Sequence, residues 1–194
     1  MYIKSLELSH YRNYHHLQVS FQPYLNVIVG KNAQGKTNLI EALYYLSLCR
    51  SFRTNQDQAL IQKEEKYANL ACQIEERKQE SYLRCILHEK GKSLFIGKIN
   101  ISKTSEFIGR LNVVLFSPED IYLFSQAPKA RRKFMDQELM KLSKKYLFHL
   151  TRYQILLKER NMLLRKTKID ETMLDILDQQ MVESEVEILK RRIS

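Results

Sequence analysis

One segment of the 194-residue sequence combines residue types and spacing that suit phosphate binding. It matches the pattern G-x-x-x-x-G-K-[ST] and consists of Gly30, Lys31, Asn32, Ala33, Gln34, Gly35, Lys36 and Thr37. Glycines let the backbone curl so that successive N–H groups face phosphate oxygens. We expect Lys36 to reach the β- and γ-phosphates of a nucleotide as a point charge, and the Thr37 hydroxyl to bind Mg²⁺. The segment therefore predicts a phosphate-binding loop.

The segments on either side of this loop have the patterns of a strand and a helix. Leu25–Val29 is more uniformly apolar than the segments before it, with Asn26 as its one polar residue, which predicts a buried strand. From Thr37 to Leu48 apolar residues recur at helical spacing, which predicts a helix that begins at the loop. A strand before the loop and a helix after it form the context that this motif requires. The N-terminus of that helix adds a partial positive charge that attracts anions.

Further strands are expected before and after this unit. Alternating apolar residues before Pro23 predict two half-buried strands, and residues 66–101 predict a meander of three strands. Asn112–Phe116 is another apolar segment and predicts a further strand. Ser117–Asp120 then has a hydroxyl cap, a proline and two acids, which are typical of a helix start. The pattern indicates an α/β fold.

The last third of the chain is predicted to be helical, since no Gly or Pro interrupts Lys129–Ser194. A helix from about Lys129 to Lys166 would be roughly 57 Å long, which is too long for a compact core. A break near Thr167–Asp170 would return a second helix. We therefore expect a head over 1–128 and a projecting helical hairpin lobe over 129–194. Because helical periodicity runs to the last residue without a stop signal, we expect an N-terminal fragment of a longer protein.

The net charge is concentrated on these helices. The sequence has 32 Lys and Arg against 22 Asp and Glu, a net charge of +10. Residues 129–168 hold thirteen bases and three acids, whereas 170–187 hold seven acids and no base. One interpretation is a DNA-binding surface, with the following candidate residues: Arg131, Arg132, Lys133, Lys144 and Lys145. The alternative is a solvated helix whose bases pair with the acidic segment.

Composition excludes several classes of protein. Hydrophobic residues make up 44% of the sequence, enough for a folded core. No apolar run approaches the roughly 18 residues of a membrane span, and no secretion signal opens the chain. Cys49, Cys72 and Cys85 are widely spaced, which argues against a disulfide framework or a cysteine zinc site, and the five histidines show no metal or base spacing. We expect a soluble cytoplasmic protein.

An ordered set of motifs resembles the RecF family of DNA replication and repair ATPases, which are related to SMC proteins and ABC ATPase heads. The resemblance covers the whole chain. Its marks are Tyr11-Arg12-Asn13, the segment NVIVGKNAQGKTNLIEALYYLS, Arg50-Ser51-Phe52-Arg53, Leu115–Asp120, and Pro128-x-x-Arg131-Arg132-x-Phe134-x-Asp136.

The resemblance implies the N-terminal part of a P-loop ABC-type ATPase head that binds ATP and Mg²⁺. It implies an ATP-dependent homodimer of the full-length protein and binding of single- and double-stranded DNA at gaps. It also implies partnership with RecR and RecO type mediators in RecA loading, and a part in the SOS response. Arg12 and Asn13 would lie beside the nucleotide.

The resemblance also sets expectations about hydrolysis. Glu119 and Asp120 fall near the position where related ATPases place a glutamine that senses Mg²⁺ and water, but we expect these acids to cap a helix. The family's serine-glycine signature and acid-tipped strand are missing, so we expect this chain to bind ATP without hydrolysing it alone. The alternatives are a metabolic P-loop kinase and a structural SMC-type coiled-coil ATPase.

Overall fold

The computed structural model describes residues 1–122, 125, 127–166 and 170–193, apart from the side chain of Glu119. The chain forms two compact units, Met1–Phe116 and Ser117–Ser194. The boundary expected from the helical pattern, between residues 128 and 129, falls inside the second unit. The reason is that the short 3-10 helix η2 (Pro118–Tyr122) groups with the helices that follow it.

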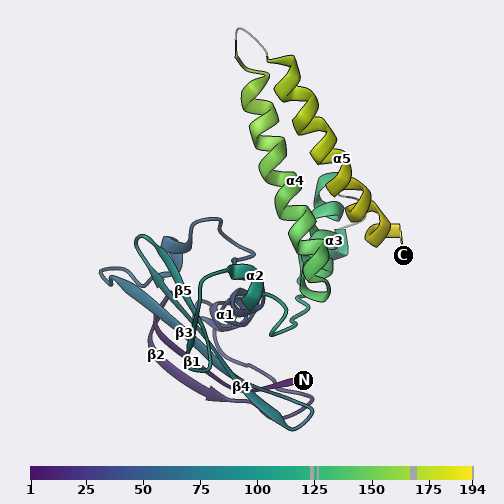
Figure 1. Ribbon diagram of the computed structural model, residues 1–194. Coiled ribbons are helices and arrows are strands. Elements are labelled where there is room, and N and C mark those ends of the chain that lie inside the picture. The colour runs from purple at the N-terminus through teal and green to yellow at the C-terminus, as the bar shows by residue number, and fades with distance from the viewer. Residues whose placement is uncertain (123–124, 126, 167–169, 194) are drawn as a thin grey trace. The chain divides into compact units, whose positions relative to one another are not determined.

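A six-stranded antiparallel sheet forms the first unit (Figure 1). Its strands are β1 (Tyr2–Tyr11), β2 (Tyr14–Ser20), β3 (Tyr67–Glu76), β4 (Gln79–His88), β5 (Gly91–Ile96) and β6 (Ile99–Ile101), in the order β2-β1-β3-β4-β5-β6. The two strands predicted before Pro23 are confirmed as β1 and β2. The predicted meander contains four strands and not three. Gly97, at φ +60°, allows a tight turn that adds β6.

The core of this unit lies between the sheet and helix α1 (Lys36–Leu48), which covers one face of it (Figure 1). Leu6 and Leu8 of β1 are fully buried, as their alternation with polar neighbours predicted. The same cluster includes Leu39 and Leu46 of α1, together with Phe107 of the short helix α2 (Thr104–Phe107). Packing against the sheet therefore fixes α1, and with it the loop that precedes α1.

Two predicted strands are absent from the described structure, and those predictions were wrong. Neither Leu25–Val29 nor Asn112–Phe116 has strand geometry. Leu25 is 78% exposed, Val29 83% and Phe116 75%. An apolar segment becomes a buried strand only when neighbouring strands satisfy its backbone groups and other layers cover its faces. No strand of the described sheet pairs with either segment.

The second unit contains the helices α3 (Pro128–Leu142), α4 (Lys144–Leu163) and α5 (Glu171–Ile193). The prediction of one continuous helix to about Lys166 was wrong, because Ser143 is extended (φ −137°, ψ 111°) and separates α3 from α4 as the N-cap of α4. Its Oγ accepts a hydrogen bond from Tyr146 N at 3.2 Å, the usual arrangement of a serine N-cap.

The predicted helical hairpin is confirmed, since α4 and α5 run side by side (Figure 1) and share buried leucines at 156, 163 and 177. Of the break expected near Thr167–Asp170, residues 167–169 lie outside the described part. Among the described helices, none has the length and apolar character needed to cross a membrane.

Candidate phosphate-binding site

The glycine-containing loop leads directly into the N-terminus of α1. Gly35 precedes the helix with φ +102°, a conformation that side chains rarely adopt. A Cβ atom added at Gly35 would lie 2.7 Å from Asn13 Nδ2 and 2.8 Å from the Tyr14 hydroxyl. Gly35 is therefore required both for the backbone turn and for the close approach of the β1–β2 turn to the loop.

Replacing Gly35 by alanine should distort the loop and reduce both stability and phosphate affinity, each by about 1–2 kcal/mol, the usual scale of a strained backbone position. Thermal unfolding and titration with a fluorescent ATP analogue would measure the two effects. The matched control is Ala33→Gly in the same loop. Ala33 has φ +64°, so removal of its Cβ should keep or raise stability. Equal losses in both variants would contradict the assigned role of Gly35.

Lys36 folds back over the loop, and its Nζ donates to the carbonyl oxygens of Gly30 and Lys31 at 2.6 Å each. Thr37 follows in the first turn of α1 and is exposed. That turn contains no acidic residue, so the positive end of the helix dipole is not offset there. An exposed loop, a helix N-terminus and a lysine ammonium together can bind a phosphate group.

The turn between β1 and β2 supports the loop through Asn13. Its Nδ2 donates to the Gln34 carbonyl at 3.2 Å, and its Oδ1 accepts from Asn38 Nδ2 at 2.8 Å. Arg12, unlike Asn13, makes its side-chain hydrogen bonds to Glu41 and Ala59 and not to the loop. Its Nε and Nη2 donate to the two carboxylate oxygens of Glu41 at 3.0 and 2.8 Å, and its Nη1 donates to the Ala59 carbonyl at 2.9 Å. Arg12 thus positions the turn, and nucleotide contact by either residue stays a prediction.

Glu41 of α1 is the centre of a buried ionic network that the sequence did not reveal. Its side chain is fully buried. It also accepts a hydrogen bond from Ser51 Oγ at 2.5 Å and lies 3.3 Å from Arg53 Nη1. Burial alone would raise the pKa of Glu41, but hydrogen bonds from Arg12 and Ser51 and the nearby arginine charges hold it below its usual value. The network joins the middle of α1 and the segment after its C-terminus to the β1–β2 turn.

Sequence reasoning missed Glu41, Asn38 and Ser51 as parts of this site. One signal was available for Glu41. It stands inside the helical apolar pattern, next to Ala42, which is buried. A carboxylate at a core position needs cationic or hydrogen-bonding partners. The identity of those partners depends on the fold, because Arg12 lies 29 positions away in the sequence.

The expectation that the acids after Asn112–Phe116 cap a helix is met by Asp120. Its Oδ2 accepts from the Ser117 backbone N–H at 2.7 Å and from the Ser117 hydroxyl at 2.8 Å. This is the arrangement of a short capped turn at the start of η2. The side chain of Glu119 lies outside the described part of the structure.

The predicted DNA-binding residues lie on α3 and α4. Arg132 and Lys133 are exposed on α3, where Arg131 is half-buried, and Lys144 and Lys145 are exposed on α4. Lys145 pairs with Glu187 of α5 at 2.6 Å. Arg160 of α4 likewise pairs with Asp178 of α5. The acidic segment therefore pairs with α4, as the solvated-helix alternative predicts.

Comparisons with known proteins agree with this geometry. The RecF/RecN/SMC N terminal domain family matches residues 2–118. The chain is 44% identical to the DNA replication and repair protein RecF of Oceanobacillus iheyensis and 42% identical to that of Bacillus mycoides, over 99% of its length in both cases. It covers 53% and 52% of those relatives, so it spans about half their length.

A solved structure, described as the recombination mediator protein RecF-ATPrS in the RecFOR pathway, has the same fold. It superposes with a TM-score of 0.94 at 32% identity, over 98% of this chain and 53% of the solved one. The RecF-ATP structure gives a TM-score of 0.92 at the same identity, over 98% of this chain and 52% of the solved one. The resemblance seen in the motifs is confirmed. The chain belongs to the RecF/RecN/SMC N terminal domain family.

Proposed function

We propose that this chain is the nucleotide-binding part of a RecF-type DNA replication and repair protein. The observation that carries the proposal is the loop Gly30–Thr37, placed at the N-terminus of α1 and supported by Asn13. The similarity to RecF proteins along nearly the whole chain supports ATP as the nucleotide. The protein would act in the cytoplasm on DNA at gaps, with RecR and RecO type mediators, in RecA loading and the SOS response.

Different groups of the loop would contact different parts of ATP and its metal ion. The loop backbone and the first turn of α1 would bind the phosphate oxygens. Lys36 would place its positive charge at the β- and γ-phosphates, and the Thr37 hydroxyl would hold Mg²⁺. The ion, when bound, neutralises phosphate charge. With Asp120 engaged in capping, we propose that these residues bind ATP without hydrolysing it and that turnover requires the ATP-dependent dimer of the full-length protein.

A second part of the proposal is that α3 contributes to DNA binding. Arg132 and Lys133 are exposed there, in the same helix as half-buried Arg131. Lys144 and Lys145 remain candidates, but the ion pair with Glu187 lowers the charge that Lys145 can offer to phosphate. Replacing Arg132 and Lys133 of α3 therefore tests the proposed DNA contact more directly than replacing Lys144 and Lys145.

Replacing Arg132 and Lys133 together by alanine in the full-length protein should weaken duplex binding and reduce its salt dependence. Each lost phosphate contact lowers the slope of log affinity against log salt by about 0.9 for B-DNA. Fluorescence anisotropy from low to physiological salt measures both quantities. The matched control removes the same charge from α4 by replacing Arg152 and Arg160, which pair with Glu183 and Asp178 of α5.

An unchanged slope in the α3 variant would mean that DNA is held elsewhere. An equal change in the α4 control would mean that the effect reflects net charge and is not specific to α3. The same measurement separates the competing functions. A metabolic P-loop kinase has no reason to bind duplex DNA. The similarity to RecF proteins favours the repair function over both that kinase and a structural SMC-type ATPase.

A further inference from the structure

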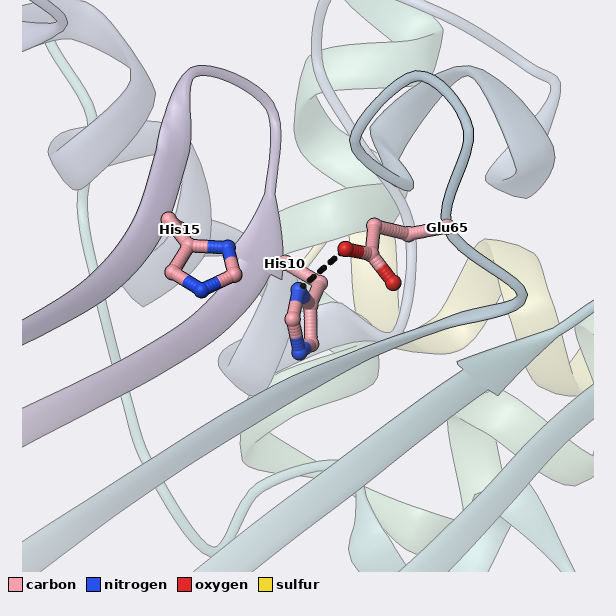
Figure 2. A group of neighbouring side chains, drawn as sticks. All are labelled: His10, His15 and Glu65. Carbon is pink, nitrogen blue, oxygen red and sulfur yellow. Dashed lines mark ion pairs between the residues drawn. The ribbon is translucent and has the colours of Figure 1, made fainter.

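Two histidines and a glutamate come together at the end of the β1–β2 hairpin, outside the phosphate-binding loop. They are His10 of β1, His15 of β2 and Glu65 of the segment before β3 (Figure 2). One ligand atom from each residue lies within 4.8 Å of the other two. The sequence showed no metal-site spacing here, because Glu65 is distant from the histidines along the chain.

The fold itself brings the three side chains together. The antiparallel register that pairs Ser9 with His16 and Tyr11 with Tyr14 places His10 opposite His15. Their rings meet edge to face at 4.8 Å between centroids. The segment carrying Glu65 is tied to the hairpin by Gln62 N, which donates to the His10 carbonyl at 2.8 Å. Glu65 N then donates to the Gln62 carbonyl at 3.1 Å, so the position of the carboxylate follows from backbone hydrogen bonds.

The Nδ1 atom of His10 is buried and has no hydrogen-bond partner with good geometry among the described residues. It nevertheless lies 3.1 Å from Glu65 Oε1, and the dashed line in Figure 2 marks this pair. Two donors of one tetrahedral zinc ion, each bound at about 2.0–2.1 Å, lie about 3.4 Å apart. This pair is therefore already close to the separation that zinc requires. His15 is exposed, and because the ligand atoms all lie within 4.8 Å of one another, rotation of its side chain has to close a gap of at most about 1.4 Å to reach the zinc separation.

We propose that His10, His15 and Glu65 bind a divalent transition metal, with Zn²⁺ as the ion that suits them best. Two imidazoles and one carboxylate form a ligand set that zinc accepts, and solvent would occupy the fourth position. The ion would join the β1–β2 hairpin to residues 61–65. Arg12 and Asn13, which support the phosphate-binding loop, follow directly in the same turn. The metal would thus act as a structural clip, meaning a link that holds the β1–β2 turn in place and, through Asn13, supports the phosphate-binding loop.

The cysteines do not compete for this role. Cys49, Cys72 and Cys85 are all buried, and burial raises the pKa values of Cys49 and Cys72 to about 12. Zinc binds the thiolate form, so these thiols are poor ligands in the folded protein. His16 is a suitable internal comparison because it is the next residue after His15 but does not belong to the cluster. Its Nδ1 lies 3.3 Å from Ser9 Oγ instead.

Titration of the full chain with zinc chloride, followed by calorimetry, tests the site. We expect saturable binding of one equivalent, and at least a tenfold loss of affinity in His15→Ala and in Glu65→Gln. His16→Ala is the matched control and should bind as the parent does. Glu65→Gln is nearly isosteric, so it separates loss of a ligand from loss of folding, which circular dichroism would monitor.

Amide hydrogen exchange tests the clip itself. At a zinc concentration that saturates the parent chain but not Glu65→Gln, zinc should slow exchange at residues 10–15 and 61–65 of the parent and leave exchange in Glu65→Gln nearly unchanged. Absence of saturable binding to the parent would overturn the proposal. Parent-like binding by His15→Ala and Glu65→Gln would overturn it as well, because the ion would then be bound elsewhere.

Discussion

Replacing Lys36 by alanine should weaken ATP binding by about 2–3 kcal/mol, the scale of a lost hydrogen bond to a charged group, or roughly 30- to 160-fold in dissociation constant. The ammonium group already lies over the loop, 2.6 Å from two of its carbonyl oxygens. Its charge is therefore close to the place where phosphate would bind. Titration with a fluorescent ATP analogue, with and without Mg²⁺, measures the loss.

Lys31→Ala is the matched control for this experiment. Lys31 lies in the same exposed loop, so the variant removes the same charge without removing the lysine of the motif. We expect Lys31→Ala to change affinity several-fold less than Lys36→Ala. Similar losses in both variants would indicate a general electrostatic effect. If Lys36→Ala bound the analogue as tightly as the parent, the loop would not be the nucleotide site.

Replacing Glu41 by alanine should lower the free energy of unfolding by about 3 kcal/mol, the lower end of the range for breaking a buried ion pair. The variant would leave Arg12, with only 20% of its side chain exposed, without its carboxylate. Arg53 is 45% exposed and would be rehydrated more easily. Urea unfolding measures the change. Glu80→Gln is the control, because Glu80 pairs with Lys4 on the surface and should contribute little.

The pH dependence gives a second test of the Glu41 network. The pKa of Glu41 is lowered in the folded protein. The ionised Glu41 carboxylate therefore contributes fully to the free energy of unfolding at pH values above the carboxyl pKa of the unfolded chain. That contribution is lost as the pH falls through the lower pKa that Glu41 has in the folded protein. The stability difference between parent and Glu41→Gln should thus be constant near neutral pH and shrink in acid. A difference that does not change with pH would show that packing, and not ionisation, is responsible.

Local sequence signals predicted the parts of this site that depend on neighbouring residues. The spacing of Gly30, Gly35 and Lys36 predicted the loop, and helical periodicity predicted α1 almost to the residue. Partners distant in sequence could not be predicted in this way. The pairing of Arg12 with Glu41 exists only because the sheet and α1 pack together. Apolar character likewise predicted a buried strand at Leu25–Val29, whereas strand formation depends on neighbours that the described sheet does not provide.

The break between α3 and α4 at Ser143 could not be predicted from local helix propensity. The sequence around it has no proline or glycine, and helix propensity alone favours continuation. The serine side chain instead caps α4 by accepting from Tyr146 N. The Tyr146 hydroxyl in turn accepts from Arg192 of α5 at 3.1 Å, and Arg192 pairs with Asp136 of α3 at 2.7 Å. Contacts among three helices thus accompany a break that local propensity does not predict.

The two exposed apolar segments affect how these 194 residues behave at high concentration. Val27, Val29, Val114 and Phe116 are 73–83% exposed and have side chains that favour extended backbone. Unpaired segments of this kind recruit the same segment of other molecules into intermolecular sheets. The net charge of +10 opposes this association through mutual repulsion between chains. Added salt, which screens that repulsion, should therefore lower the concentration at which the isolated polypeptide aggregates.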